Sequence, residues 1–402
     1  MTRPLRLTVI VPELLPVPAT QGGAIEQWVH EVTARLPADR LHIRICSRPT
    51  TERSPNGIEN VHIPWTGLEQ FFSRIKAQST WRNPLRYLAK IVCVSRYGQR
   101  LGPALADSDI IYLHNEPNLL LFIRKRPGQR VVLHMHNDHL SSRAFRPLYR
   151  RLLAKVDAVI CVSDYIRRCA LQHFPEYADK FQVLFNAVDA QQFKPYGDEA
   201  RAALPPALQA QLPPGRPTVL YVGRLVPEKG VDVLIRAFAQ LKLRLPEARL
   251  VVVGSSFFAG AARTPYQDEL VKLAASFQDD IVFTGFVPHA QLRYLYAQAD
   301  VIAFPPVWGE PCALVVLEAM ASGVCFVATS VGGIPEVMTD QVTGLLVPAG
   351  DAPALEQALH RALTQPAQRQ QWAGAARQRI LSGYDWPHLM ARLPQLLEGP
   401  TA

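Results

Sequence analysis

The strongest constraint on the fold is a regular alternation of short apolar runs with longer helical patterns, on both sides of a proline-rich break. Before residue 190 the runs of strand length are Leu7–Val11, Leu41–Cys46, Ile110–His114, Val131–His136 and Ala158–Val162. After residue 217 they are Thr218–Val222, Arg249–Val253, Ile281–Thr284, Val301–Ala303 and Cys325–Ala328. Strands separated by helices are typical of parallel sheets with crossover connections. The sequence therefore predicts an α/β fold with doubly wound sheets.

The length of 402 residues suits two domains of roughly 200 residues each. Between Phe193 and Pro217 the chain is rich in Ala, Gln and Pro, which is typical of a linker. We expect an N-terminal acceptor-binding domain over 1–192, a linker over 193–217 and a second domain over 218–375. A C-terminal helix over 376–402 is expected to pack back on the first domain. In such sheets ligands bind beyond the carboxyl ends of the strands.

The net charge of +9 is concentrated in the first half of the chain. Residues 1–190 carry 26 Lys and Arg against 16 Asp and Glu, a balance of +10, whereas residues 191–402 carry 17 against 18, a balance of −1. The segment Arg143–Arg151 interleaves cations with apolar residues, as an anionic membrane surface would favour. A solvated helix face is the alternative. No nucleic-acid-binding motif is present, so we expect no nucleic acid partner.

Three further features indicate a cytoplasmic protein. The six cysteines include no CxxC pair and no cluster at metal-ligand spacing, which favours reduced thiols and no metal site. No apolar run approaches the length of roughly 20 residues that a membrane-spanning helix needs. The first residues lead directly into an apolar strand and lack the cleavage site of a signal peptide. Association with the inner face of the cell membrane stays open as an alternative.

Two cations lie in the predicted strand-to-helix loop that follows Thr218–Val222. The loop reads Gly223-Arg224-Leu-Val-Pro-Glu-Lys229-Gly230 and leads into a helical run. A fixed Arg and Lys beside a helix N-terminus can neutralise the charge that develops on a departing diphosphate. A solvated lysine in an ordinary loop is the alternative interpretation.

A second motif, Gly309-Glu310-Pro311 to Gly323, follows the strand that ends near Phe304. Pro311 near the first turn and Gly323 past the last predict a helix whose N-terminal amides can face a phosphate or sugar hydroxyls. Glu318 lies within this apolar helix, where a carboxylate is costly unless it has a partner. A ribose diol would be a suitable partner, and a neighbouring amide or Arg is the alternative.

The order and spacing of these two motifs resemble the donor site of the family-4 retaining glycosyltransferases. That resemblance extends from about Leu5 to the end of the chain and implies the GT-B fold, two Rossmann-like domains facing each other across a cleft. It also implies a nucleotide-diphosphate sugar as co-substrate, with no metal and no other cofactor. Gly223, Arg224 and Lys229 would hold the diphosphate, and Glu310 would face the transferred sugar beside the amides of Cys312, Ala313 and Leu314. Glu318 would hold the ribose.

The same resemblance implies further contacts. The base would meet the backbone at Gly285 and Phe286, although we expect the Phe286 ring itself to lie in the core. Gly22 and Gly23 would form a glycine-rich loop that closes over the sugar, and a histidine would lie at the end of the fifth strand. Alternation places His134 and His136 on the same side of that strand, and we choose His136 as the catalytic one. His114 is the competing candidate.

Some residues depart from the family pattern or suggest another chemistry. Ala187 stands where a glycine is usual, and Ser255-Ser256 follow Gly254 without a second glycine. Cys312 and Ala313 replace an aromatic residue and a glycine, so sugar specificity does not transfer. Asp107-Ser108-Asp109 has the DxD form of metal-dependent enzymes, but its place between a helix and a strand indicates a cap or turn.

The resulting functional hypothesis is retaining, metal-independent transfer of a sugar, with a UDP-sugar favoured over a GDP-sugar. The acceptor would be a hydroxyl of a glycan, a lipid-linked glycan or a small molecule, in the biosynthesis of cell-surface polysaccharide or lipopolysaccharide. Two alternatives stay open. One is a nucleotide-sugar epimerase or hydrolase on the same fold, and the other is a non-catalytic sugar-binding or coat protein.

Overall fold

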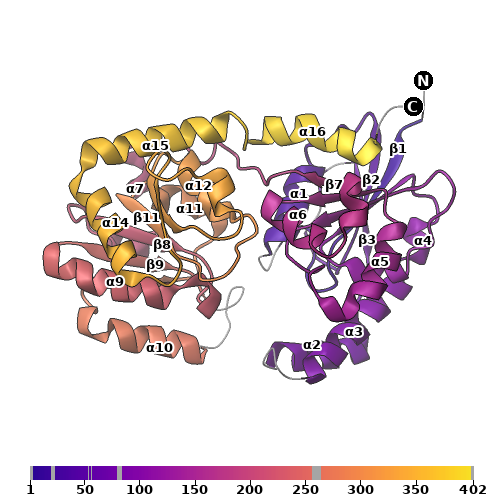
Figure 1. The fold of residues 1–402 in the computed structure, drawn as a ribbon, viewed down its shortest axis with the longest axis horizontal. Helices are drawn as coiled ribbons and strands as arrows, with labels where there is room; N and C mark the ends of the chain where they lie inside the picture. The colour runs from indigo at the N-terminus through magenta and orange to yellow at the C-terminus, as the bar shows by residue number, and fades with distance from the viewer. Residues whose placement is uncertain are drawn as a thin grey trace. The chain divides into compact units, whose positions relative to one another are not determined.

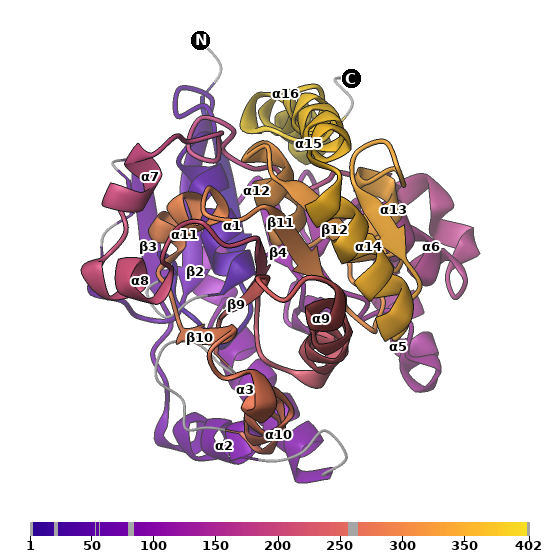
Figure 2. The ribbon, with the colours of Figure 1, turned by 90° about the vertical axis from the view of Figure 1, so that its left-hand side faces the viewer.

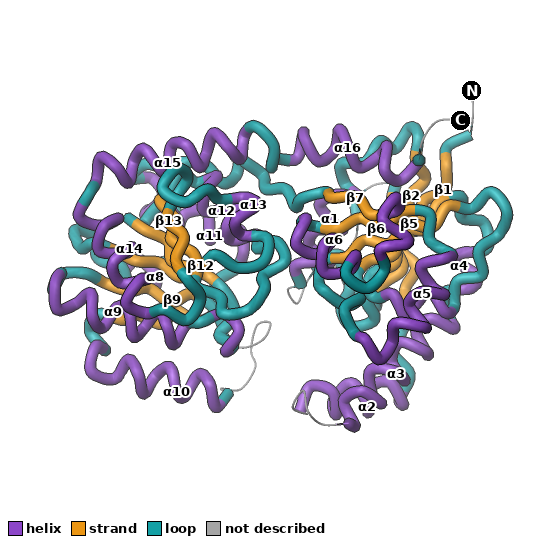
Figure 3. Tube along the Cα trace, viewed as in Figure 1, coloured by secondary structure: helices purple, strands orange, loops and turns teal. Residues whose placement is uncertain are grey.

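The computed structural model describes residues 3–19, 23–52, 54–55, 57–78, 84–255 and 264–399. Within these ranges the chain divides into two compact units, Met1–Leu184 with Met390–Ala402, and Phe185–Leu389. Each unit is built on one parallel sheet with helices around it (Figures 1 and 3). No helix of the described chain has the length and apolar character needed to cross a bilayer.

The first unit holds a seven-stranded sheet in the order β3-β2-β1-β4-β5-β6-β7, in which all neighbours are parallel. Its strands are β1 Leu5–Ile10, β2 Leu41–Ser47, β3 Ile58–His62, β4 Ile110–His114, β5 Arg130–Met135, β6 Ala158–Cys161 and β7 Phe181–Val183. Its α-helices are α1 Ala24–Thr33, α2 Gly67–Gln78, α3 Pro84–Gln99, α4 Gly102–Leu105, α5 Arg146–Ala154 and α6 Asp164–Leu171, and its 3₁₀ turns are η1 Pro117–Leu121, η2 Arg143–Phe145 and η3 Pro175–Lys180.

The second unit holds a six-stranded parallel sheet in the order β10-β9-β8-β11-β12-β13. Its strands are β8 Thr218–Val222, β9 Arg249–Val253, β10 Ile281–Gly285, β11 Val301–Phe304, β12 Cys325–Thr329 and β13 Leu345–Val347. Its helices are α7 Glu199–Ala202, α8 Pro206–Gln211, α9 Val231–Arg244, α10 Pro265–Ala274, α11 His289–Tyr296, α12 Leu314–Ala321, α13 Ile334–Val337, α14 Ala352–Thr364 and α15 Pro366–Leu381, with 3₁₀ turns η4 Pro227–Lys229 and η5 Ala275–Phe277.

Both sheets have the buried, apolar strands that parallel sheets require because helices cover them. Every residue of β4, β8, β9, β11 and β12 is buried. In the second unit α9 packs against α14, and α12 packs against α15; Figure 2 shows the first pair side by side. In the first unit α2 and α3 pair as a helical hairpin that projects from the rest of the unit (Figures 1 and 2).

The expected linker over 193–217 is wrong, because this segment is folded into the second unit. It contains α7 and α8, and Leu204, Leu208 and Leu212 are buried in that unit's core. Only Leu208 lies within a helix, α8, while Leu204 precedes that helix and Leu212 is its C-cap. No helical periodicity therefore marks the three leucines in the sequence. The chain divides instead between Leu184 and Phe185.

The end of the chain is shared between the two units. Helix α16, Trp386–Glu398, buries Leu389, Leu393 and Leu397 at four-residue spacing. Its residues from Met390 onward group with the first unit, where Glu398 pairs with Arg40 at 2.5 Å. Residues 376–389 group with the second unit, so the expected boundary at 376 lies too early by about four helical turns.

Candidate active site

In the second unit, the motif residues gather at the carboxyl ends of β8 and β11, which are neighbours at the centre of the sheet. The two strands are far apart in sequence order, so this is the switch point at which doubly wound sheets bind ligands. The loop after β8 carries Gly223, Arg224 and Lys229, and the loop after β11 carries Glu310. The structure thus brings the two sequence motifs together in one unit.

Lys229 and Glu310 form a buried ion pair. The Lys229 Nζ lies 2.5 Å from Oε2 of Glu310, and Trp308 Nε1 donates to the same oxygen at 2.9 Å. The ammonium group also lies 5.1 Å from the centre of the Phe304 ring and 5.7 Å from that of Trp308. Both charges are nearly out of water, where a lone charge would be costly, so each stabilises the other. Trp308 is a site residue that the sequence motifs did not single out.

Glycines let the loops approach closely enough to form this site. Gly230 has φ +66°, and a Cβ at this position would overlap the carbonyl oxygen of Pro305, at the end of β11. Gly332 has φ +59°, and its backbone lies against that of Glu310, whose carbonyl accepts from Gly333 N at 2.8 Å. The pair Gly332-Gly333 after β12 was also missed in the sequence, although two adjacent glycines after an apolar run are a visible signal.

Arg224 lies in the same loop with an exposed side chain, unlike Lys229. Its backbone carbonyl accepts from the hydroxyl of Tyr221 at 3.0 Å, which holds the turn while the guanidinium is left on the surface. The neighbouring Gly223 donates its N–H to Val253 O, which extends the pairing of β8 with β9 by one residue. The loop therefore offers one exposed and one buried cation.

The helix of the second motif begins later than the sequence predicts. Helix α12 starts at Leu314, with Ala313 as its N-cap in an extended conformation, so Pro311 lies three residues before the helix and not in its first turn. The three residues Cys312, Ala313 and Leu314 are only partly buried, which leaves the helix N-terminus accessible. The Cys312 carbonyl accepts from Asn186 Nδ2 at 3.2 Å, and burial raises the pKa of the Cys312 thiol to about 12.

Glu318 is buried in α12, and both of its carboxylate oxygens have partners in the protein. The Tyr296 hydroxyl donates to Oε2 at 2.7 Å, and His289 Nε2 lies 2.7 Å from Oε1. Tyr296 is fully buried, whereas the His289 side chain is 53% exposed. A ribose hydroxyl could therefore reach Oε1 by displacing His289, while Oε2 stays bound to Tyr296.

The turn after β10 carries the residues expected to contact the base. Gly285 has φ +74°, and its carbonyl accepts from Gly254 N at 2.9 Å, at the end of β9. The Phe286 side chain is 51% exposed, so our expectation that it belongs to the core is wrong. Its position directly after the end of the edge strand β10 leaves its side chain at the surface.

In the first unit, Gly23 caps α1 with φ +115°, and Gly22 lies outside the described residues. A Cβ on Gly23 would overlap the carboxylate of Glu26, which is folded back toward the start of the helix. Burial, with a smaller contribution from the nearby charge of Glu13 and against the lowering effect of a backbone hydrogen bond, raises the pKa of Glu26 to about 7. Neither carboxylate was singled out in the sequence, because a single Glu at the start of a helix is an ordinary feature.

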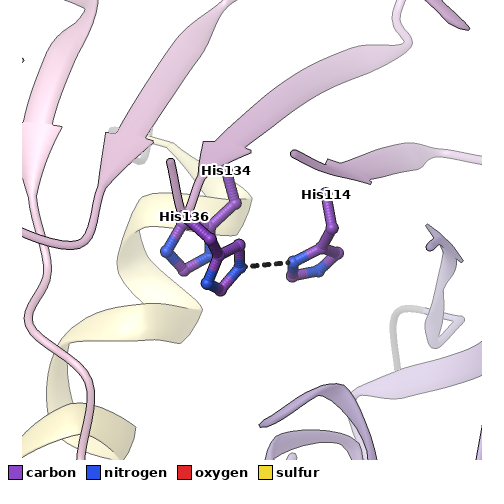
Figure 4. A group of neighbouring side chains, drawn as sticks. All are labelled: His114, His134 and His136. Atoms are coloured by element: carbon purple, nitrogen blue, oxygen red, sulfur yellow. Dashed lines mark hydrogen bonds between the residues drawn. The ribbon is translucent and has the colours of Figure 1, made fainter. Parts of the chain in front are cut away.

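His136 lies directly after β5 and forms part of a buried group with His114 and His134 (Figure 4). The competing candidate His114 is in contact with it, since His114 Nδ1 and His136 Nε2 are 3.0 Å apart. His134 and His136 lie on the same side, with ring centres 4.2 Å apart, as predicted from strand alternation. Burial lowers the pKa of His136 to about 3 and places the pKa values of His114 and His134 well below the usual range.

Asp107 and Asp109, from the DxD sequence, lie next to the amino end of β4, far along the strand from the ligand edge. Asp109 accepts from the backbone N–H of Arg6 at 2.9 Å and pairs with Arg3, and Asp107 pairs with Arg6 and Arg44. The side-chain hydrogen bond from Arg44 lowers the pKa of Asp107. Arginines thus neutralise both carboxylates, which supports the interpretation of this segment as a structural turn.

Sequence comparison identifies two families along the chain. The family described as glycosyl transferases group 1 matches residues 208–379, and the one described as glycosyltransferase family 4 matches residues 22–192. The first match spans the loops that carry Arg224, Lys229 and Glu310. The second spans Gly23 and the histidine group.

Named relatives cover nearly the whole chain. The lipopolysaccharide 1,2-N-acetylglucosaminetransferase of Salmonella typhimurium is 27% identical, with 98% of each protein covered. A GDP-mannose-dependent phosphatidylinositol monomannoside mannosyltransferase of Mycolicibacterium smegmatis is 31% identical over 84% of this chain and 90% of the relative. The crystal structure of Anabaena HepE with UDP and glucose superimposes with a TM-score of 0.74 at 19% identity, over 98% of this chain and 99% of HepE.

These matches agree with the geometry in fold and in the position of the motifs. The structural neighbours establish the GT-B type of fold, and the two sequence relatives described above are named as glycosyltransferases. The chain belongs to the family-4 glycosyltransferases.

Proposed function

We propose that the protein is a retaining glycosyltransferase that transfers a sugar from a nucleotide-diphosphate sugar to an acceptor hydroxyl. The observation that carries this proposal is the buried contact of Lys229 with Glu310 on adjacent loops, beside the exposed Arg224. A donor diphosphate would compete with Glu310 for Lys229, and Arg224 and the accessible start of α12 would supply further positive charge. Glu310, released from Lys229, would then be available to a sugar hydroxyl.

The chemistry follows from which charges the site can stabilise. As the bond from the anomeric carbon to the diphosphate breaks, negative charge grows on the leaving phosphate, where Lys229 and Arg224 stabilise it. The acceptor hydroxyl attacks from the same face, and a leaving phosphate oxygen takes its proton. The anomeric configuration is thereby retained without a covalent enzyme intermediate and without a metal ion.

Among donors we favour a UDP-sugar. Anabaena HepE, which has the same fold, was crystallised with UDP and glucose, whereas the mycobacterial relative is named for GDP-mannose. Glu318, which keeps one oxygen on Tyr296 and can release the other from His289, is suited to a ribose diol, a group that both nucleotides carry. The Glu318 contact therefore does not distinguish UDP from GDP, and a binding experiment has to do so.

Thermal unfolding with UDP, GDP, ADP and UMP tests the donor site, at fixed salt and with and without magnesium. A ligand at a hundredfold excess over Kd adds about 2.7 kcal/mol of apparent stability. We expect UDP to raise the melting temperature of the wild type but not that of Lys229→Ala, and UMP to raise neither. Lys272→Ala on the exposed side of α10 is the matched control. Binding of no diphosphate would refute the donor site and favour a non-catalytic scaffold.

Product analysis tests the reaction itself. With the donor that binds, NMR spectroscopy of the product's anomeric proton should show the configuration of the donor sugar. Inversion of that configuration would refute the retaining mechanism. Turnover of donor with no product on any acceptor would instead identify a hydrolase or an epimerase.

For the acceptor we propose a glycan carried at an anionic membrane surface. The hairpin of α2 and α3 exposes six large apolar side chains, among the described residues: Leu68, Phe71, Leu85, Tyr87, Leu88 and Ile91. Arg74 and Arg96 are exposed on the same hairpin, while its acid Glu69 is buried between Arg48 and Arg100. Apolar side chains beside exposed cations are suited to the interface of an anionic bilayer.

Vesicle flotation tests this acceptor surface. We expect the protein to float with vesicles that contain anionic lipid, and not with purely zwitterionic ones, and to be released as salt is raised. The double variant Phe71→Ser with Ile91→Ser should lose binding. Leu243→Ser, at an exposed leucine on α9, is the control and should retain it. Equal loss in both variants, or no preference for anionic lipid, would refute the surface and favour a small-molecule acceptor.

A further inference from the structure

The histidine group in the first unit follows directly from the register of the sheet. Parallel pairing places His114 of β4 beside His134 of β5, and His136 follows two residues later on the same side. The ring of Trp28, from α1, packs against all three imidazoles, with centre distances of 4.8 to 5.4 Å. His114 and His134 are fully buried, and His136 alone has a small exposed edge. Figure 4 shows the rings of His136 and His114 turned toward each other, with the hydrogen bond between them dashed.

The contact between His114 and His136 requires one donor and one acceptor. Burial keeps all three imidazoles neutral, as their lowered pKa values indicate, and a neutral imidazole carries a proton on only one of its two nitrogens. His114 Nδ1 and His136 Nε2 share a hydrogen bond of 3.0 Å, so one ring donates and the other accepts. The direction of this bond fixes the tautomer of both rings.

The other nitrogen of His114 decides the direction. His114 Nε2 is buried and has no hydrogen-bond partner among the described residues. A buried N–H without an acceptor is rarer and more costly than a bare lone pair, so the proton lies on Nδ1 of His114. That Nδ1–H then donates to Nε2 of His136, and the proton of His136 must be on its Nδ1.

The backbone around His136 is fixed as well. The side-chain oxygen of Asn115 accepts from the N–H groups of His136 at 3.0 Å and of Asn137 at 2.9 Å. Asn115 itself has φ +54°, directly after β4, which turns its side chain toward the end of β5. The His136 ring is thus held by Asn115 through the backbone, by His114 through Nε2 and by Trp28 through an edge-type ring contact.

We propose that His114 is a positioning residue that locks His136 in the Nδ1–H tautomer, so that His136 offers a hydrogen-bond donor to a hydroxyl of the transferred sugar. This inference rests on the proposed function, in which His136 meets that sugar. It assigns a role to His114, the candidate that the sequence left in competition with His136. Because Nδ1 of His136 would donate and not accept, the sugar oxygen that it meets must have a free lone pair.

A metal ion is the rival interpretation of the same three residues, since one nitrogen from each lies within 4.8 Å of the others. A metal binds the lone pair in the plane of each imidazole ring. The His134 and His136 rings lie nearly parallel, at 28° with centres 4.2 Å apart, so they face each other and their lone pairs do not converge. The observed arrangement therefore favours the hydrogen bond.

The test on the wild type is NMR spectroscopy of protein labelled with ¹⁵N in its histidines, near neutral pH. Two-bond correlations report which ring nitrogen carries the proton, and the His136→Asn variant assigns the signals. We expect both His114 and His136 to be protonated on Nδ1 and bare on Nε2. A proton on Nε2 of His136, or metal analysis that finds one equivalent of zinc bound to the three rings, would overturn the proposal.

Two substitutions at His114 test the consequence for catalysis. Asn can place an amide donor near the position of Nδ1, whereas Leu cannot. We expect His114→Leu to lower kcat about 10- to 100-fold, with little change in KM for the donor and with the His136 proton moved to Nε2. His114→Asn should restore most of kcat and the tautomer, and His360→Leu on α14 should change neither.

Equal loss in the Asn and Leu variants, or an unchanged His136 tautomer in His114→Leu, would refute the positioning role. The tautomer is measured without substrate and so is independent of the reaction. If the wild type transfers no sugar, the proposed function fails while the NMR result still decides the state of His136.

Discussion

At the scale of single residues, the site is defined by charges that are buried and paired before any ligand binds. Oε2 of Glu310 accepts from both Lys229 and Trp308, so the cation that would hold a diphosphate is already neutralised. Part of the binding energy of the donor must therefore be used to separate this pair. The ion pair lowers affinity for the diphosphate and at the same time keeps two charges stable in a buried place.

Replacement of Glu310 by Gln should separate binding from catalysis. Lys229 would lose its anionic partner and be free for phosphate, so we expect Kd for UDP to fall roughly tenfold. Transfer should nevertheless fall by about 100-fold or more, because the carboxylate proposed to meet the sugar is gone. Calorimetric titration and initial rates measure the two effects. Glu228→Gln, exposed in the neighbouring loop, is the control, and weaker UDP binding in Glu310→Gln would contradict the competition.

Glu26 should make stability depend on pH in a direction unusual for a carboxylate. Its pKa is about 7 in the folded protein against a usual value of 4.5, so the folded state holds the proton more tightly. Its contribution to stability is full below pH 4.5 and is lost as pH rises through 7, by roughly 3 kcal/mol in total.

The Glu26→Gln variant isolates this effect from other titrating groups. Urea unfolding at pH 5 and pH 8 should show that the variant gains free energy of unfolding relative to the wild type as pH rises. Glu31→Gln, on the same helix at a half-buried carboxylate paired with Arg35, should differ from the wild type by the same amount at both values. A constant difference between Glu26→Gln and the wild type would show that burial does not shift this carboxyl.

At the scale of elements, the candidate site is built from one arrangement that occurs twice, at the neighbouring strands β8 and β11. Each time a strand leads through a short loop to the start of a helix. In the first case β8 leads through η4 to α9, and in the second β11 leads through the Glu310 loop to α12. The loops meet because glycine permits backbone contact between them, with Gly230 against Pro305. The geometry of the proposed donor site is thus a property of the two loops together.

Gly230→Ala should destabilise the protein by more than the left-handed backbone conformation at this position alone would cause. A left-handed φ costs an alanine about 1 kcal/mol, and the overlap with Pro305 O adds a displacement of the loop. Gly215→Ala is a matched control, because Gly215 also has a positive φ but has nothing within 4 Å of its Cβ position. We expect Gly230→Ala to lower the free energy of unfolding by more than Gly215→Ala does, and to weaken UDP binding. Equal effects would show that the contact is unimportant.

At the scale of the whole molecule, the two units have separate cores. The main apolar cluster of the second unit runs from Val188 to Ile380 and lies entirely inside it. The first unit is completed by residues from the end of the chain, including Leu393 and Leu397 of α16. Because each sheet is closed by its own helices, we expect each unit to unfold cooperatively by itself.

Differential scanning calorimetry should therefore resolve two transitions, and UDP should raise the temperature of one of them. The stabilised transition belongs to the second unit, which holds Lys229, Glu310 and Glu318. Lys229→Ala should remove the shift and leave the other transition unchanged. A single transition, or an equal shift of both by UDP, would show that the units are thermodynamically coupled.

The sequence determined the α/β class, ten of the strands and the two motifs that meet in the second unit, because apolar periodicity and loop residues are local properties. It did not reveal the edge strands β3, β7 and β13, the last two of which have only three residues each, nor the burial of Leu204, Leu208 and Leu212 in a segment that resembles a linker. It placed Pro311 near the first turn of a helix that begins only at Leu314, and Phe286 in the core.

Tertiary structure alone decided the partners of the functional groups. The contacts of Tyr296 and His289 with Glu318, and of His114 with His136, join residues from different elements. Trp308 and its partner Glu310 share one loop. Which side chains meet depends on the order and register of the strands, and the pairing of His114 with His134 is set by β4 and β5 together. Spacing along one chain carries no record of that register, so the chemistry could be predicted from the motifs but its electrostatic control could not.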